Sequence, residues 1–236
     1  NNIYFYAGGT ARMYFSDNNI QYRVSKYDLS TGQYTELWTY TGDDRVDVFG
    51  ENTGKVNGMS DGSYVRMDSN GNFYIMTSST GNNNDTLIKV NFDKNTSEVI
   101  YTTDMEKLYS LQSDGEYLYF FESTQSRETK SYFTAIDMNG TLKAQYEMEY
   151  DEEFLEKAKK YYEQYPEDTS VVVDASGICV YGIDERYILM GSNSDSDVYK
   201  NLKSLNSKPY KKVITTGVGV INKMDYLNSG TASIKR

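Results

Sequence analysis

Three side chains with oxygen donors alternate along one segment of the chain: Asn193, Asp195 and Asp197. Alternate residues of an extended segment point to the same side, and calcium prefers several carboxylate and amide oxygens from a flexible loop. The spacing therefore predicts a calcium site, with a plain polar loop as the alternative. Segment 68–72 alternates Asp and Asn in the same way. Its glycine at position 71 is typical of a tight turn, so there we favour a turn.

A second set of residues suited to binding lies near position 40. Trp38 and Tyr40 are aromatic residues on which a sugar ring can stack, and Asp43 and Asp44 open an acidic loop at 43–47. We predict that these four residues contact a ligand. The competing interpretation is an aromatic strand packed in the core, followed by a solvated acidic loop.

The inventory of reactive residues excludes several kinds of catalysis. The chain contains no histidine and a single cysteine, Cys179. Ser-His-Asp and Cys-His catalysis, histidine zinc sites and thiolate clusters are therefore excluded within this chain. Cys179 has apolar neighbours, and we expect an inert thiol in a buried strand. Carboxylate chemistry remains open, because a glycosidase needs only two acids at a suitable separation.

The charge of the chain bears on its partners and location. The formal net charge is −10, from 34 acidic and 24 basic residues, which repels nucleic acid and anionic membranes. No window has the roughly 18 consecutive apolar residues of a membrane span, and residues 1–4 show no signal core. Without an initiating Met, we expect a mature or excised domain. Richness in Tyr, Asn, Ser, Thr and Gly is typical of Gram-positive surface proteins, so we expect a secreted or cell-surface location.

The elements that must position these residues are repeated hairpins. Four segments share an alternating strand, an aspartate, a short polar turn and a second strand, and their aspartates are Asp28, Asp93, Asp137 and Asp225. The carboxylate of such a residue accepts hydrogen bonds from turn amides two or three residues further on, which predicts a β-hairpin in each segment. Two more strand candidates precede each hairpin, so the predicted unit has four strands.

The preceding strand candidates lie at 3–6 and 12–15, 63–67 and 72–77, 108–112 and 116–121, and 178–181 and 186–190. We predict one all-β domain over 1–236, with repeat units at about 1–40, 60–101, 106–148 and 169–236. The aspartate spacing of 137 − 93 = 44 fits a propeller blade. The predicted fold is a β-propeller of about four four-stranded blades, complete or part of a larger ring. A β-sandwich is the alternative, because short, evenly spaced strands suit both folds.

The order strand-Asp-x-x-Thr-Gly-strand at 27–33 resembles the outer hairpin of bacterial extracellular propeller repeats of the quinoprotein-like and YWTD-like kinds. The resemblance covers four units and most of the chain. It implies an extracellular binding or scaffolding role and carries over no catalytic residue.

Residues 151–165 break the strand pattern. Apolar and aromatic residues recur there at helical spacing, namely Phe154, Leu155, Ala158, Tyr161, Tyr162 and Tyr165. Asp151 can cap the first turn and Pro166 ends the helix, which predicts one inserted amphipathic helix. We expect it to cover its own aromatic stripe locally, with partner binding as the alternative.

Two functional hypotheses follow from these observations. The first is a non-enzymatic extracellular binding or scaffold domain that recognises a protein or glycan partner through its blade-connecting loops. The alternative is a carbohydrate-active enzyme with a carboxylate pair in a central pocket. That alternative predicts two acids in the pocket whose pKa values are raised.

Overall fold

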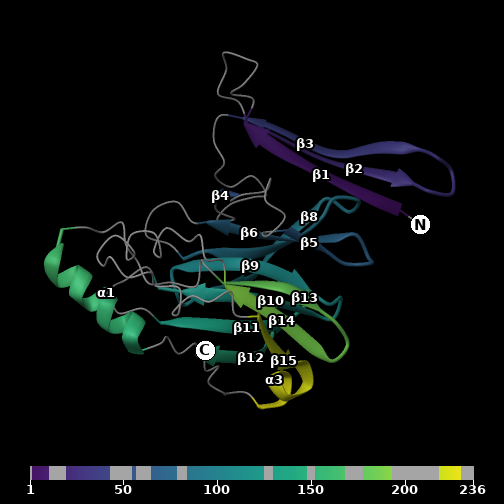
Figure 1. Cartoon of the computed structure of the whole chain (residues 1–236). Coiled ribbons are helices and arrows are strands. Elements are labelled where there is room, and N and C mark those ends of the chain that lie inside the picture. The colour runs from purple at the N-terminus through teal and green to yellow at the C-terminus, as the bar shows by residue number, and fades with distance from the viewer. Residues whose placement is uncertain are drawn as a thin grey trace. The chain divides into compact units, whose positions relative to one another are not determined.

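The computed structural model describes residues 2–10, 20–42, 55–56, 65–78, 84–124, 130–147, 152–167, 178–192 and 218–229. They belong to two compact units, unit 1 at Asn1–Asp104 and unit 2 at Met105–Arg236. The described part of each unit contains two antiparallel β-sheets (Figure 1). No helix within the described ranges is long and apolar enough to cross a membrane. The single-domain organisation of 1–236 remains a prediction.

Unit 1 contains one sheet of order β1-β2-β3 and one of order β4-β6-β7-β8, in which β5 also pairs with β6. The strands of the first sheet are β1 (Asn2–Thr10), β2 (Ile20–Asp28) and β3 (Tyr34–Gly42). Those of the second are β4 (Lys55–Val56), β5 (Val65–Met67), β6 (Asn72–Ser78), β7 (Thr86–Asn91) and β8 (Thr96–Thr102).

Unit 2 contains one sheet of order β12-β11-β10-β9 and one of order β13-β14-β15. The strands of the first sheet are β9 (Lys107–Ser113), β10 (Tyr117–Ser123), β11 (Ser131–Asp137) and β12 (Leu142–Glu147). Those of the second are β13 (Ile178–Ile183), β14 (Tyr187–Ser192) and β15 (Val218–Asn222). The described part of unit 2 also contains the helices α1 (Glu152–Gln164) and α3 (Lys223–Ser229).

Each sheet is built from one continuous stretch of chain. Strands that are neighbours in a sheet are also neighbours in sequence, apart from β4, which pairs with β6 across the intervening β5. Such a meander is typical of a propeller blade, whereas immunoglobulin-type sandwiches exchange strands between their two sheets through Greek-key connections. The prediction of a mostly β chain of successive antiparallel sheets is confirmed.

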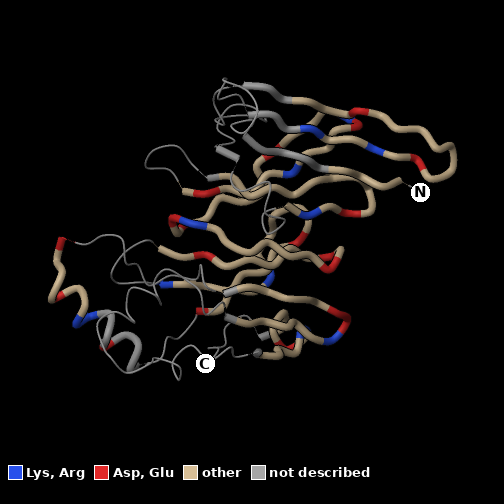
Figure 2. Tube along the Cα trace, turned by 45° about the horizontal axis from the view of Figure 1, so that its top comes forward, with Lys and Arg blue, Asp and Glu red and all other residues tan. Residues whose placement is uncertain are grey.

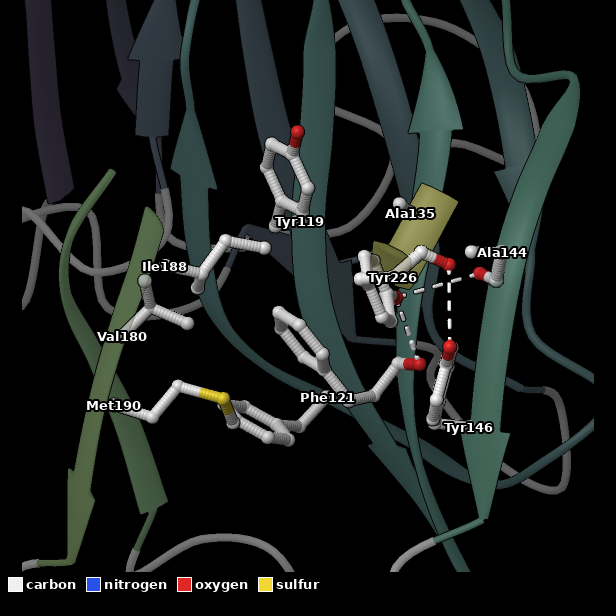
Figure 3. Close-up of a cluster of buried hydrophobic side chains, with 10 residues drawn as sticks. Tyr119, Phe121, Ala135, Ala144, Tyr146, Val180, Ile188, Met190 and Tyr226 are labelled. Carbon is white, nitrogen blue, oxygen red and sulfur yellow. Dashed lines mark hydrogen bonds between the residues drawn. The ribbon is translucent and has the colours of Figure 1, made fainter. Parts of the chain in front are cut away.

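An apolar core lies between the two sheets of each unit. In unit 1, Val24 of β2 packs with Phe73, Ile75, Ile88 and Val90 of the second sheet. In unit 2, side chains of β13 and β14 face Tyr119 and Phe121 of β10 (Figure 3). Burial of these large apolar and aromatic side chains removes their surface from water, which is the main source of stability for such a unit.

The middle strands are buried on both faces. Residues 118–123 of β10 each expose at most 1% of their surface, although successive side chains of a strand point to opposite faces. Residues 73–77 of β6 are likewise buried. Tyr119 and Phe121 of β10 both lie in the core of unit 2, and Tyr117 of the same strand packs against that core.

The fourth predicted hairpin is wrong. Asp225 does not follow a strand, because β15 ends at Asn222 and the chain continues into helix α3. The side chain of Asn222 caps that helix by accepting a hydrogen bond from the Asp225 amide, at 3.1 Å. The helix then directs Tyr226 into the core, where it is 1% exposed.

Other local predictions have clear outcomes. Helix α1 (152–164) confirms the helix predicted at 151–165, with Tyr161 and Tyr162 buried. Tyr165 lies past the last helical residue and is exposed, so it does not belong to the buried stripe. The strand predicted at 12–15 lies outside the described residues.

Candidate functional site

The residues predicted to bind a ligand lie in different surroundings. Trp38 on β3 is half-buried, and its ring packs on Phe92 with 5.4 Å between ring centroids. Tyr40 belongs to the same strand, but its side chain lies outside the described part. The remaining predicted residues also lie outside the described residues: Asp43, Asp44, Asn193, Asp195 and Asp197. The ligand patch and the calcium site therefore stay predictions.

Segment 68–72 is a turn, as favoured from its glycine. One oxygen of the Asp68 carboxylate accepts the amides of Asn70 and Asn72, at 2.8 and 3.0 Å. The other accepts the Asn72 side chain at 2.8 Å and the Tyr74 hydroxyl at 3.1 Å. Both oxygens thus serve the turn. Within the described ranges, no group of three or more Asp, Glu, Cys or His residues could hold a metal ion.

The same kind of turn recurs twice in unit 2. Asp114 accepts the amides of Glu116 and Tyr117, at 2.9 and 2.8 Å, and the hydroxyl of Tyr119 at 2.9 Å. Asp184 accepts the two amides at the matching positions of the β13–β14 turn, at 2.7 and 2.6 Å. These three aspartates fix the turns that precede β6, β10 and β14, because they satisfy backbone amides that would otherwise need water.

A second position that carries Asp or Asn recurs at the end of β2, β7, β11 and β15. Strand register places four residues opposite the first residue of β1, β6, β10 and β14, namely Asp28, Asn91, Asp137 and Asn222. Each accepts a backbone amide two or three residues further on, from Ser30, Lys94, Asn139 and Asp225. The hairpin prediction is confirmed for Asp28 and Asp137. For Asp93 the predicted hairpin is present as β7–β8, but Asn91 and not Asp93 accepts the turn amide, because an asparagine carbonyl can accept the same bond. The hairpin prediction is wrong for Asp225, which lies in helix α3.

Asp93 instead links the two sheets of unit 1. Its carboxylate accepts the ammonium of Lys26 at 2.7 Å and the hydroxyl of Tyr4 at 3.1 Å. The bond from Lys26 holds the pKa of Asp93 below its usual value. Lys26 and Tyr4 come from β2 and β1, so this ion pair ties the first sheet to the β7–β8 turn. The separation along the chain is too large for the sequence to signal it.

A more deeply buried ion pair lies in unit 2. The Lys223 ammonium is 3.1 Å from the Asp114 carboxylate, and the two side chains are 13% and 8% exposed. Burial would raise the pKa of Asp114, but the amides of Tyr117 and Glu116 and its other donors outweigh it and lower that pKa. Burial also raises the pKa of Tyr119, which stays a hydrogen-bond donor. The pair fixes the β9–β10 turn to the start of α3.

Described carboxyl groups with a shifted pKa all shift downward. They are Asp28, Asp68, Asp93, Asp114, Asp137 and Asp184. A general acid at neutral pH needs the opposite shift, so these carboxylates act as hydrogen-bond acceptors of the fold. They recur at the turns that join successive strands, where Figure 2 shows acidic residues.

These pKa values predict a loss of stability in acid. Burial would raise the pKa of Asp137, but bonds from Thr141, Asn139 and Lys143 outweigh it and lower that pKa to about 2. In an unfolded chain the value is about 3.9. The stabilisation is therefore complete above about pH 5 and is lost as pH falls toward 2. We expect the urea midpoint, followed by circular dichroism, to fall across this window.

The matched variant for this prediction is Asp137→Asn, because an asparagine already holds the equivalent hairpin turn at Asn91. It should keep the turn and flatten the dependence on pH. Glu185→Gln, at an exposed turn position, is the control and should keep the wild-type slope. Equal slopes for all three proteins would contradict the assignment.

Glu122 is a buried acid that sequence reasoning missed. It is 1% exposed and accepts bonds from the Thr134 hydroxyl and, at 2.8 Å, from the Gln145 amide. These partners belong to β11 and β12, so the carboxyl joins three neighbouring strands of one sheet. A buried polar group needs such partners, and here they define a structural role.

The outer face of sheet β13–β15 is apolar and exposed. Tyr181, Leu189 and Val220 expose 56%, 37% and 61% of their surfaces. Cys179 lies on this face and is partly exposed, so the expected burial of its thiol is wrong. Its sulfur lies 3.7 Å from the Gly191 carbonyl. We call these residues the β13–β15 outer face; contiguous exposed apolar residues of this kind commonly mark interaction surfaces.

No family model and no curated protein sequence matches the chain. A nidogen/laminin complex resembles it at 15% identity and a TM-score of 0.32, over 55% of this chain and 45% of that chain. The β-propeller domain of the Trilobed protease from Pyrococcus furiosus does so at 12% and 0.43, over 99% and 71%. TolB from Acinetobacter baumannii follows at 11% and 0.37, over 86% and 40%. The chain thus spans less than half of the first and last of these. TM-scores below 0.5 support no functional assignment.

Proposed function

We propose that the chain is an extracellular binding or scaffold domain with β-propeller architecture. The successive meander sheets act as its blades, and the loops that connect strands recognise a protein or glycan partner. The recognition requires no catalytic group. The observation that carries this proposal is the difference between the two ends of each sheet.

At one end, which we call the turn end, the strands are joined by short turns. Asp or Asn side chains hold these turns, at 28–33, 68–71, 91–95, 114–116, 137–141 and 184–186. The opposite end is the loop end. There β1 is joined to β2, β6 to β7, β10 to β11 and β14 to β15, by residues 11–19, 79–85, 124–130 and 193–217 respectively. Binding residues of proteins concentrate in the loops that connect the strands of a rigid scaffold.

The residues predicted to bind a ligand follow strands that run toward the loop end. β3 leaves the turn at Asp28 and runs to Gly42, which Asp43 and Asp44 follow in the chain. β14 leaves the turn at Asp184 and ends at Ser192, which Asn193 follows. Both sets thus follow, in sequence, a strand that ends at the loop end of its own unit. This order along the chain supports binding there, and calcium stays a proposal for 193–197.

A glycan array and a panel of purified surface proteins test the proposal directly. For any binder found, replacing 193–217 by Asn-Gly, which leaves Ser192-Asn-Gly as a three-residue hairpin loop between the paired Gly191 and Val218, should weaken binding at least about tenfold. The thermal midpoint should not change. Asp43→Asn with Asp44→Asn tests the loop end of unit 1 in the same assay.

Glu185→Gln, at the turn end of the same sheet as 193–217, is the matched control and should bind like wild type. Binding that survives both loop-end variants but is lost in the control would contradict the proposal. Silence on both panels together with turnover of a glycan would also contradict it, and would favour the carboxylate enzyme.

A further inference from the structure

Strand register makes residues of different sheets equivalent. Asn2 pairs with Asp28, and Tyr187 pairs with Asn222, at the same turn position of their sheets. Counting from this pair, Ile3 of β1 occupies the position of Ile188 of β14. Phe5 of β1 occupies the position of Met190. The two strands therefore present the same kind of apolar side chain to the same side of their sheets.

The two equivalent pairs differ in burial. Ile188 and Met190 are 0% and 6% exposed, because they pack against the sheet β9–β12 in the core of unit 2. Ile3 and Phe5 are 43% and 50% exposed. With Tyr27 and the exposed Tyr34 they form what we call the β1–β3 outer face. On this face the charges of Arg23 and Glu36 neutralise each other in an ion pair of 2.9 Å.

The opposite side of the sheets shows the complementary difference. Register places Leu189 of β14 at the position of Tyr119 of β10. Tyr119 is fully buried, because the sheet β13–β15 covers it. Leu189 is 37% exposed, and Tyr181 and Val220 on the same face are also exposed. The β13–β15 outer face is thus equivalent to the surface of the sheet β9–β12 against which Ile188 and Met190 pack.

We propose that the β13–β15 outer face of one copy of this chain receives the β1–β3 outer face of a second copy. Ile3 and Phe5 then take the places against Leu189 and Val220 that Ile188 and Met190 take against Tyr119 and Phe121. The contact continues the sheet-on-sheet packing seen inside each unit. Because the two surfaces differ, the association is head-to-tail and forms a closed ring or a growing chain of copies.

The glycine at position 191 shapes the receiving surface. A Cβ there would come within 2.2 Å of the Tyr181 ring, so the glycine leaves room for this ring against β14. No residue of β13–β15 on this side carries a charge, which leaves the face free of the desolvation cost of burying one. The proposal requires only sheet packing, and it is independent of partner recognition at the loop end.

Sedimentation velocity as a function of protein concentration tests the association, with a reductant present because Cys179 lies on the face. The wild-type chain should associate as its concentration rises. Leu189→Lys and Phe5→Lys should each weaken self-association at least about tenfold, since each buries an unpaired charge. Mixing the two variants should restore a one-to-one dimer, because one intact surface of each remains.

Leu29→Lys and Met224→Lys change exposed apolar residues outside the two faces and should associate like wild type. Circular dichroism melting shows that each variant is folded. A wild-type chain that stays monomeric at every concentration would overturn the proposal. So would a Phe5→Lys variant that self-associates normally, because that result indicates a symmetric contact. Replacement of 193–217 separates the two proposals, since it should abolish partner binding and leave association intact.

Discussion

Replacing Asp114 by alanine is expected to lower the free energy of unfolding of unit 2 by about 3–5 kcal/mol. The substitution leaves the Lys223 ammonium, only 13% exposed, without its carboxylate. It also removes the acceptor of the buried Tyr119 hydroxyl and of two turn amides. Amide hydrogen exchange of β9–β12 measures the effect within unit 2, whereas fluorescence of Trp38 reports on unit 1.

Asp184→Ala is the matched control, because Asp184 makes the same two amide bonds but is exposed. We expect a much smaller loss, because water can take the place of the exposed carboxylate at the turn amides. The double variant Asp114→Ala with Lys223→Met should recover part of the loss, since it removes the unpaired charge. Equal losses for Asp114→Ala and Asp184→Ala would show that the buried pair contributes nothing beyond the turn.

Replacing Tyr226 by alanine is expected to cost about 3–5 kcal/mol, the usual range for deleting a large aromatic side chain from a core. Its ring lies 4.6 Å from that of Tyr146 and 5.0 Å from that of Phe133. Its hydroxyl donates to the Phe133 carbonyl at 3.0 Å. Figure 3 shows it reaching from α3 into the sheet. Urea unfolding followed by hydrogen exchange of β11 and β12 measures the loss.

Tyr226→Phe separates the ring from the hydroxyl. It keeps the packing and removes one buried hydrogen bond, so we expect a cost of about 1 kcal/mol. A phenylalanine variant as unstable as the alanine variant would show that the hydroxyl, and not the ring, holds α3 on the sheet. A small effect for both would mean that α3 is not part of the cooperative core.

Local features of the fold could be predicted because their causes lie within a few residues. The turns at Asp28, Asp68 and Asp137 follow from carboxylates that reach amides two to four residues away. Helix α1 follows from apolar spacing. The positions of Asn91 and Asn222 could have been found by the same reasoning, because asparagine and aspartate offer the same acceptor. Whether the chain after each of these asparagines forms a hairpin or a helix could not be predicted in this way.

For the candidate functional residues, too, the sequence and the structure give different information. The alternation of Asn193, Asp195 and Asp197 and the sequence around Trp38 indicate a chemistry, but not a location. Only the structure shows that β3 and β14 run toward the loop end. Only burial distinguishes Ile3 and Phe5 from their equivalents Ile188 and Met190.

The sequence by itself determined the strands, the turns held by side chains and the exclusion of histidine and thiolate chemistry, because each depends on residue type and short spacing. The tertiary structure alone decided that Asp93 pairs with Lys26 and Asp114 with Lys223. It also decided that the chain after β15 forms a helix, and which apolar faces stay exposed. These features depend on partners from distant parts of the chain, whose approach is set by the packing of whole sheets.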